Sequence, residues 1–139
     1  MNIQPHQRFK KEIFLTPEIT SSFAKAAGDL NPIHHDPEFA ATTRFGRLIA
    51  SGTHTSALLM GLTANHFSTF GAMVGLEFSL YFKKPVFADE TIVLEWLIVD
   101  TKPHKRTQGL IVDLRGRIQN SEGITSVGAK GKVLVAETL

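Results

Sequence analysis

The chain has 139 residues, which is about the length of one domain and too short for two ordinary ones. Hydrophobic residues make up 42% and charged residues 20% of it, an ordinary globular composition that excludes a disordered or membrane-spanning chain. The net charge of +2 comes from scattered Lys and Arg residues, without the concentrated basic patch that nucleic-acid binding requires. Cysteine is absent, which excludes disulfides and thiolate metal ligands.

The ends of the chain carry no recognisable targeting signal. Residues 1–8 lack the apolar core of a signal peptide, and the last three residues match no familiar address. No apolar run is long enough to cross a bilayer. We therefore expect one domain over residues 1–139 that lies in the cytoplasm and binds neither membrane nor nucleic acid.

Residues 8–15 predict a first strand, which ends at a helix-start signal. Thr16 is a suitable N-cap and Pro17 a suitable first helical residue. Gly28 stands where a helix commonly stops, so the helix is expected to end just before Asp29. One face of this helix carries the apolar residues Ile19, Phe23, Ala26 and Ala27.

The segment Asp29–Asp36 is predicted to be an ordered connection between helices. Its last residue, followed by Pro37, repeats the cap-and-proline signal and predicts a second, short helix over residues 37–44. From residue 51 to about residue 65 few charges interrupt the apolar residues. We expect a long helix there that is buried on most sides and polar only at its start.

After Gly71 the apolar period changes to two, which is typical of half-buried strands. This pattern predicts an α+β fold in which an antiparallel sheet curves around the long helix. Such a sheet leaves edge strands exposed, so pairing with a second copy of the chain is expected. The strands expected after Gly71 are residues 75–82, 91–99, 110–115 and 127–135. In the strand over residues 75–82, one face carries Leu76, Phe78, Leu80 and Phe82.

Asp29 and His34 flank a turn that Pro32 makes rigid, and both side chains can reach one water molecule. A carboxylate accepts a proton from such a water, and a histidine, with an ordinary pKa of about 6.5, exchanges protons near neutrality. The alternative is turn chemistry alone, in which Asp29 and Asn31 bond their own backbone. The spacing leaves both interpretations open.

Gly52 begins the long apolar helix and is the second candidate. The unpaired N–H groups of a first helical turn, together with the helix dipole, favour negative charge that develops on a substrate oxygen. The alternative is that glycine here only permits close packing. Ser51 and His54 beside it either assist such a site or cap the helix.

Other polar clusters are weaker candidates. His34, His35, Asp36 and His54 lack the spacing of metal ligands, and adjacent histidines usually point in different directions, so no metal site is expected. Several cations stand at expected strand ends, where they are either solvated or meet the phosphates of a ligand. These are Lys83, Lys84, Lys102, Lys105 and Arg106.

Taken together, the candidate residues resemble the hydratase 2 motif of the MaoC-like dehydratases, a family that includes the (R)-specific enoyl-CoA hydratases of the hotdog fold. The resemblance continues through residues 45–52, 84–86 and 89–91, and so extends over nearly the whole domain. The motif positions are filled by Phe23, Ala27, Gly28, Asp29, Asn31, Pro32, Ile33, His34 and Ala40.

The resemblance implies a hotdog domain that adds water reversibly to a trans-2-enoyl-CoA thioester, giving the (R)-3-hydroxyacyl-CoA. It implies Asp29 and His34 as the catalytic pair and Gly52 as the backbone donor to the thioester carbonyl. We add Asn31, Ser51, His54 and Lys84 as candidate substrate-binding residues. The expected partners are the acyl-CoA thioester and a second copy of the chain, with no cofactor and no metal.

The chain departs from the family pattern in two places, of which the first bears on the substrate and the second only on the local backbone. Many short-chain (R)-hydratases have His-Gly-Met where this chain has Ser51-Gly52-Thr53, and Ala88-Asp89 replaces a Gly-Asp turn. The reaction class therefore transfers more safely than the acyl chain. Two other functions stay open at this point: a hotdog thioesterase, and a non-catalytic subunit that binds acyl thioesters.

Overall fold

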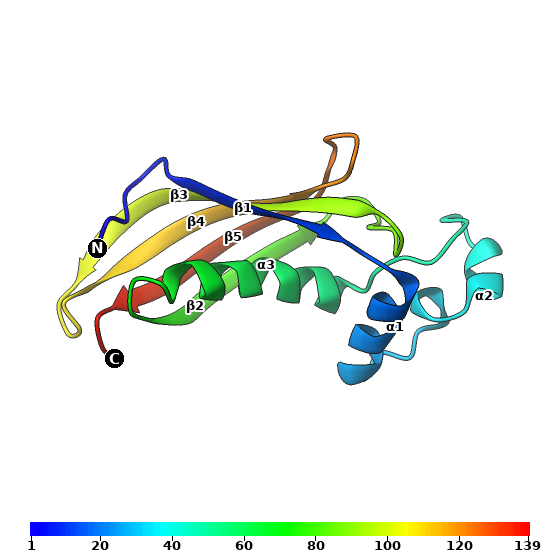
Figure 1. The fold of residues 1–139 in the computed structure, drawn as a ribbon, viewed down its shortest axis with the longest axis horizontal. Coiled ribbons are helices and arrows are strands. Elements are labelled where there is room, and N and C mark those ends of the chain that lie inside the picture. Colours follow the sequence, from blue (N-terminus) through cyan, green and yellow to red (C-terminus); the bar gives the residue numbers. More distant parts are fainter.

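A computed structural model covers residues 1–139 and contains one antiparallel sheet that curves around one long helix, α3 (Figure 1). The strand order across the sheet is β1-β3-β4-β5-β2, so β1 and β2 are the two edges. None of the helices is both long enough and apolar enough to cross a membrane. The strands are β1 (Arg8–Phe14), β2 (Ala72–Phe82), β3 (Thr91–His104), β4 (Gly109–Gln119) and β5 (Thr125–Ala136).

Each helix begins at a side-chain cap that the sequence predicts. The hydroxyl of Thr16 accepts the N–H of Ile19 at 3.2 Å at the start of α1, and the Asp36 carboxylate accepts two N–H groups at the start of α2. Ser51 caps α3 in the same way. These bonds satisfy donors that a helix leaves unpaired in its first turn. The helices are α1 (Pro17–Ala26), the 3₁₀ turn η1 (Pro32–His34), α2 (Pro37–Ala41) and α3 (Gly52–Phe67).

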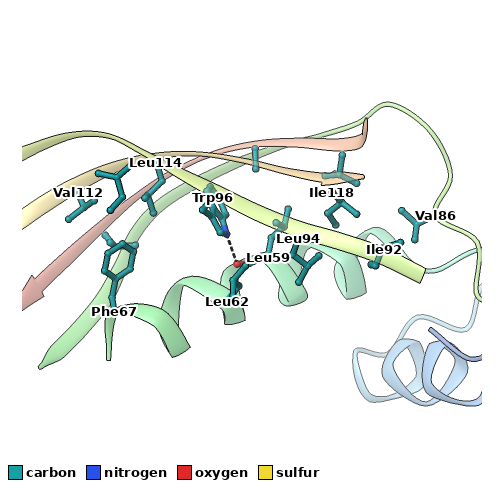
Figure 2. Close-up of a cluster of buried hydrophobic side chains, with 14 of the residues drawn as sticks. Leu59, Leu62, Phe67, Val86, Ile92, Leu94, Trp96, Val112, Leu114 and Ile118 are labelled. Carbon is teal, nitrogen blue, oxygen red and sulfur yellow. Dashed lines mark hydrogen bonds between the residues drawn. The ribbon is translucent and has the colours of Figure 1, made fainter. Parts of the chain in front are cut away.

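The core lies between α3 and the concave face of the sheet (Figure 2). Leu59 and Phe67 of α3 are fully buried there against Trp96 and its neighbours on β3. The indole N–H of Trp96 donates to the backbone carbonyl of Leu59 at 2.9 Å, so its polar atom is satisfied inside the core. This contact fixes α3 along the sheet. The predicted arrangement of a curved antiparallel sheet around a central helix is thus confirmed.

Two expectations about the short helices are wrong. Ile19 is 51% exposed, and the buried side of α1 consists of Thr20 and Ala24, because this helix packs on α3 and η1 with only a narrow face. The second helix, α2, ends at Ala41 instead of residue 44. The hydroxyls of Thr42 and Thr43 bond the last helical carbonyls and close it early.

The predicted apolar face of β2 is only partly buried. Phe78 and Leu80 pack on the core, but Leu76 is 49% and Phe82 58% exposed. A bulge is the reason for Leu76: Gly75 pairs with Val133 and Glu77 with Lys132, which leaves Leu76 without a partner. Phe82 is uncovered because β2 is an edge strand of the sheet.

α3 is buried or half-buried on most sides, as expected, but part of it is uncovered in the single chain. Its first residues and a stripe along the side away from the sheet are exposed. That stripe consists of Met60, Gly61, Ala64 and Asn65. Figure 1 shows α3 lying along the sheet. The same figure places α1 and α2 beside the start of α3, away from both termini.

Candidate active site

The turn after α1 places Asp29 with one carboxylate oxygen free. Gly28 adopts a φ of +79°, a left-handed conformation that glycine adopts without strain, and the N–H of Asp29 then bonds Ala24 at 2.8 Å. Oδ1 of Asp29 accepts the N–H of Asn31 at 3.0 Å. Asn31 itself caps η1 through its side-chain oxygen. Hydrogen bonds within the turn therefore occupy the Asn31 side chain and Oδ1 of Asp29. They leave Oδ2 of Asp29 available.

That second oxygen faces His34. Oδ2 of Asp29 lies 3.3 Å from Nε2 of His34, whose side chain is 8% exposed against 32% for Asp29. On the other side of the ring, Nδ1 lies 2.8 Å from the backbone carbonyl of Ile49. A carbonyl can only accept, so Nδ1 carries the hydrogen and donates it, and Nε2 is left to exchange a proton toward Asp29. The fold thus brings together Asp29 and His34, the pair that the sequence predicted.

Ile49 is held in place by a short ribbon of two chain segments. Ala50 donates its N–H to Val86 at 2.7 Å, and Ala88 donates to Leu48 at 3.0 Å. Arg47 ties the same segments together: its guanidinium carbon lies 3.7 Å from the centre of the Phe87 ring, and Nε lies 3.3 Å from Oδ1 of Asp89. This ribbon fixes the carbonyl that orients His34.

Gly52 lies at the first position of α3, beside the same cavity. His54 and Thr55 donate their N–H groups to Ser51, whereas the N–H of Gly52 comes ahead of these bonds in the first turn and has no intrahelical partner. A Cβ at Gly52 would meet the ring of Phe82 at 3.2 Å. The cavity, of about 380 Å³, is lined by His34, Gly52, Thr55, Phe82 and the loop around Pro85.

Cations line the mouth of this cavity. Arg44, Lys83 and Lys84 all contribute to its wall, and none of them forms an ion pair within the chain. The cavity wall contains no carboxylate. Three unpaired cations at the entrance give an anionic group of a ligand a favourable place to lie. We call these three residues the cationic rim.

Ser51 and His54 lie behind the cavity and do not line it. Ser51 is fully buried as the cap of α3. The ring of His54 is 2% exposed and stacks on Phe23 of α1, with 4.5 Å between ring centres and 10° between planes. Burial lowers the pKa of His54, and its Nδ1 has no hydrogen-bond partner. Their expected role in substrate binding stays a prediction.

Sequence reasoning found His34, Gly52 and Lys84, which line one cavity, and Asp29, which contacts His34 but does not itself line the cavity. It missed Arg44, Phe45 and Phe82 in the cavity wall and the Ile49 carbonyl behind His34. A basic residue two positions before Gly46 was visible, but nothing local indicates that it reaches a cavity formed by distant segments. A backbone carbonyl leaves no trace in the sequence at all.

A curved antiparallel sheet around one helix defines a hotdog domain, and the contact between Asp29 and His34 makes its cavity a candidate active site. Residues 1–115 match the family described as "MaoC like domain", and the chain belongs to that family. The resemblance drawn from the motif is thereby confirmed.

Curated relatives and solved structures agree with this assignment. The chain is 40% identical over 75 residues to "(R)-specific enoyl-CoA hydratase" of Aeromonas caviae, covering 54% of this chain and 55% of the relative. It is 34% identical over 96 residues to "3-hydroxybutyryl-CoA dehydratase" of Methylorubrum extorquens, covering 66% and 60%. The aligned stretches thus span less than two thirds of both relatives.

The fold is matched over nearly the full length. The solved (R)-hydratase from A. caviae superposes with a TM-score of 0.86 at 28% identity, covering 97% of this chain and 98% of that one. The predicted hotdog architecture is therefore confirmed.

Proposed function

We propose that the protein is a hydro-lyase that adds water reversibly to a trans-2-enoyl-CoA thioester, giving the (R)-3-hydroxyacyl-CoA. One observation carries the proposal: Oδ2 of Asp29 lies 3.3 Å from Nε2 of His34, and His34 lines the same cavity as Gly52, the first residue of α3. The two curated relatives, a hydratase and a dehydratase, support the same reaction class.

The pair binds the water that is added. With Nδ1–H of His34 directed at Ile49, Nε2 and Oδ2 of Asp29 both accept, so one water can donate a hydrogen to each. As the water oxygen bonds to C3 of the enoyl group, Asp29 takes one proton of the water, and the Asp29/His34 pair then delivers that same proton to C2. Water is thus divided into a hydroxyl on C3 and a hydrogen on C2, and the pair ends as it began.

Gly52 stabilises the charge that moves onto the thioester. Attack at C3 pushes electrons through C2 into the carbonyl, whose oxygen becomes an enolate. The unpaired N–H at the first position of α3, supported by the helix dipole, donates to that oxygen. Such a donor acts more strongly on the transition state than on the neutral substrate.

The cationic rim receives the phosphates of the carrier. Coenzyme A has phosphates at the end of the thioester remote from the reacting carbons, and Arg44, Lys83 and Lys84 surround the outer part of the cavity that His34 lines. Lys84 is therefore assigned to substrate binding through charge.

The active form is a homodimer joined through β2. This strand is an edge of the sheet, its outer side carries exposed apolar residues, and its last residue lies in the cavity wall. Exposed apolar edge strands favour pairing with another chain. The site then lies next to the dimer interface.

Purified protein tests the reaction with crotonyl-CoA, by loss of the ultraviolet absorbance of the conjugated thioester. We expect turnover, and a loss of roughly a hundredfold or more in kcat for Asp29→Asn and for His34→Ala, because each removes a proton-transfer group. Asn keeps the oxygen that accepts the Asn31 N–H, so Asp29→Asn separates chemistry from folding.

Three results would contradict the proposal. Both variants turning over crotonyl-CoA like the wild type would remove the pair from the chemistry. Release of free thiol from a saturated acyl-CoA would indicate a thioesterase. Tight binding of crotonyl-CoA without any product would indicate a non-catalytic subunit.

A further inference from the structure

His35, the residue after the catalytic histidine, uses both ring nitrogens inside the protein. Nδ1 lies 2.7 Å from the hydroxyl of Ser21 on α1, and Nε2 lies 2.8 Å from the backbone carbonyl of Asp29. The carbonyl only accepts, so Nε2 carries a hydrogen and donates it. In the neutral ring Nδ1 then accepts the hydroxyl hydrogen of Ser21. His35 therefore connects α1 to the peptide unit that follows Asp29.

This contact completes a set of bonds around Asp29. Its N–H donates to Ala24 at 2.8 Å, and its Oδ1 accepts from Asn31 at 3.0 Å. With the carbonyl bound to His35, the only polar atom of Asp29 that faces away from these contacts is Oδ2, at 3.3 Å from His34. The backbone on both sides of the carboxylate is thus held, and the direction of Oδ2 follows from it.

The two adjacent histidines are fixed in opposite tautomers. His34 donates from Nδ1 to Ile49, which leaves Nε2 for the reaction, whereas His35 donates from Nε2 to Asp29 and accepts at Nδ1. Their ring planes are inclined by 81°, with 6.2 Å between centres. Neither ring can replace the other, because each backbone carbonyl selects a different nitrogen.

We propose that His35, anchored by Ser21, is a positioning residue that holds the Asp29 backbone so that Oδ2 meets the water shared with His34. The proposal rests on the function assigned to Asp29 and His34 above. His35 does not line the cavity, so its effect belongs to the orientation of a catalytic group and not to substrate binding. Small displacements of a reacting group are costly: about 1 Å can lower a rate roughly a hundredfold.

A variant series separates positioning from packing, using kcat and KM for crotonyl-CoA. His35→Phe keeps a ring but loses both bonds, and we expect kcat to fall about tenfold or more, with KM within about threefold. His35→Gln can donate from its amide nitrogen to Asp29 and accept from Ser21 with its oxygen, so it should restore kcat to within about threefold of wild type. Ser21→Ala should have a smaller effect, and no further effect in the His35→Phe background, because both act through one contact.

His104 provides a matched control. Its Nδ1 bonds the hydroxyl of Thr107 at 2.9 Å in the hairpin between β3 and β4, the same kind of contact as that of His35 with Ser21. His104→Phe should leave kcat unchanged. A kcat for His35→Phe within twofold of wild type, or a loss that His35→Gln does not restore, would overturn the proposal.

Ring nitrogen shifts in ¹⁵N-histidine-labelled wild-type protein, at pH 8, test the contact without any turnover. The expected result is a hydrogen on Nε2 of His35 and on Nδ1 of His34. A hydrogen on Nδ1 of His35 would disprove the bond to Asp29. If the wild type does not hydrate crotonyl-CoA, the proposed function fails, and the tautomer of His35 alone then decides whether it holds Asp29.

Discussion

At the residue scale, Lys83 and Lys84 should affect binding of the carrier and not the chemistry. Replacing both with Gln removes two charges from the cationic rim, so KM for crotonyl-CoA should rise about tenfold or less while kcat stays within twofold, because partly solvated charge contacts are weak and salt-sensitive. The effect should shrink at high salt and vanish for the crotonyl thioester of N-acetylcysteamine, which has no phosphate.

Lys105 and Arg106 are the matched control for this prediction. They lie in the turn between β3 and β4, and their replacement by Gln removes the same charge. An equal rise of KM in that control would show that only net charge matters.

His54 should make the folded state sensitive to acid. Burial lowers its pKa from the ordinary 6.5, so between the lowered value and 6.5 the unfolded chain binds more protons than the folded one. The free energy of unfolding is therefore not reduced by His54 above pH 6.5, and it decreases as the pH falls below 6.5. His54→Phe preserves a ring against Phe23 and should flatten this decrease, measured as the free energy of unfolding in urea at pH 7.5 to 5.

The decrease should not disappear completely in His54→Phe. Burial also lowers the pKa of His66, which contributes with the same sign. An unchanged pH dependence in His54→Phe would show that the buried ring is not responsible.

At the element scale, the start of α3 must admit a ligand beside Phe82. A Cβ at Gly52 would lie 3.2 Å from that ring, closer than ordinary contact, so Gly52→Ala should displace the ring over the N–H and lower kcat/KM about tenfold. Because Phe82 is largely exposed, the double variant Gly52→Ala/Phe82→Leu should recover part of the loss in the crotonyl-CoA assay. Gly52→Ala with wild-type kinetics would remove this steric requirement.

Local signals in the sequence predicted the elements well where the cause was itself local. Thr16, Asp36 and Ser51 are the observed caps, and the change of period after Gly71 marks the first of the consecutive strands. The errors arose where a distant partner decides. Leu76 lost its predicted face because a bulge against β5 left it unpaired, which the strand's own pattern does not encode.

The candidate site also combines features with a local cause and features that depend on distant partners. Asp29, Asn31 and His34 lie within one turn, so their proximity followed from the residues between them. The cationic rim, by contrast, depends on residue 44 meeting the loop after β2, and the support of His34 depends on a carbonyl in a ribbon. Such contacts are set by the whole fold, so the residues near each of them in the sequence do not predict them.

At the scale of the whole molecule, the two edges of the sheet differ in chemistry. The β1 edge exposes charged side chains, which discourage pairing, whereas β2 has a single charged residue, Glu77, and a largely apolar exposed side. The exposed residues are Arg8, Lys10, Lys11, Glu12 and Phe14 on β1, and Val74, Gly75, Leu76, Glu77, Ser79, Tyr81 and Phe82 on β2.

This asymmetry predicts that two copies pair through β2, and a pair of lysine variants tests it by sedimentation velocity. Leu76→Lys places a charge in the proposed interface and should shift the protein from dimer to monomer, with loss of turnover because Phe82 of the same strand lines the cavity. Phe14→Lys makes the equivalent change on β1, where the side chain is 63% exposed, and should leave the dimer and its activity intact. A monomeric wild type, or a dimer that survives Leu76→Lys but not Phe14→Lys, would assign the interface elsewhere.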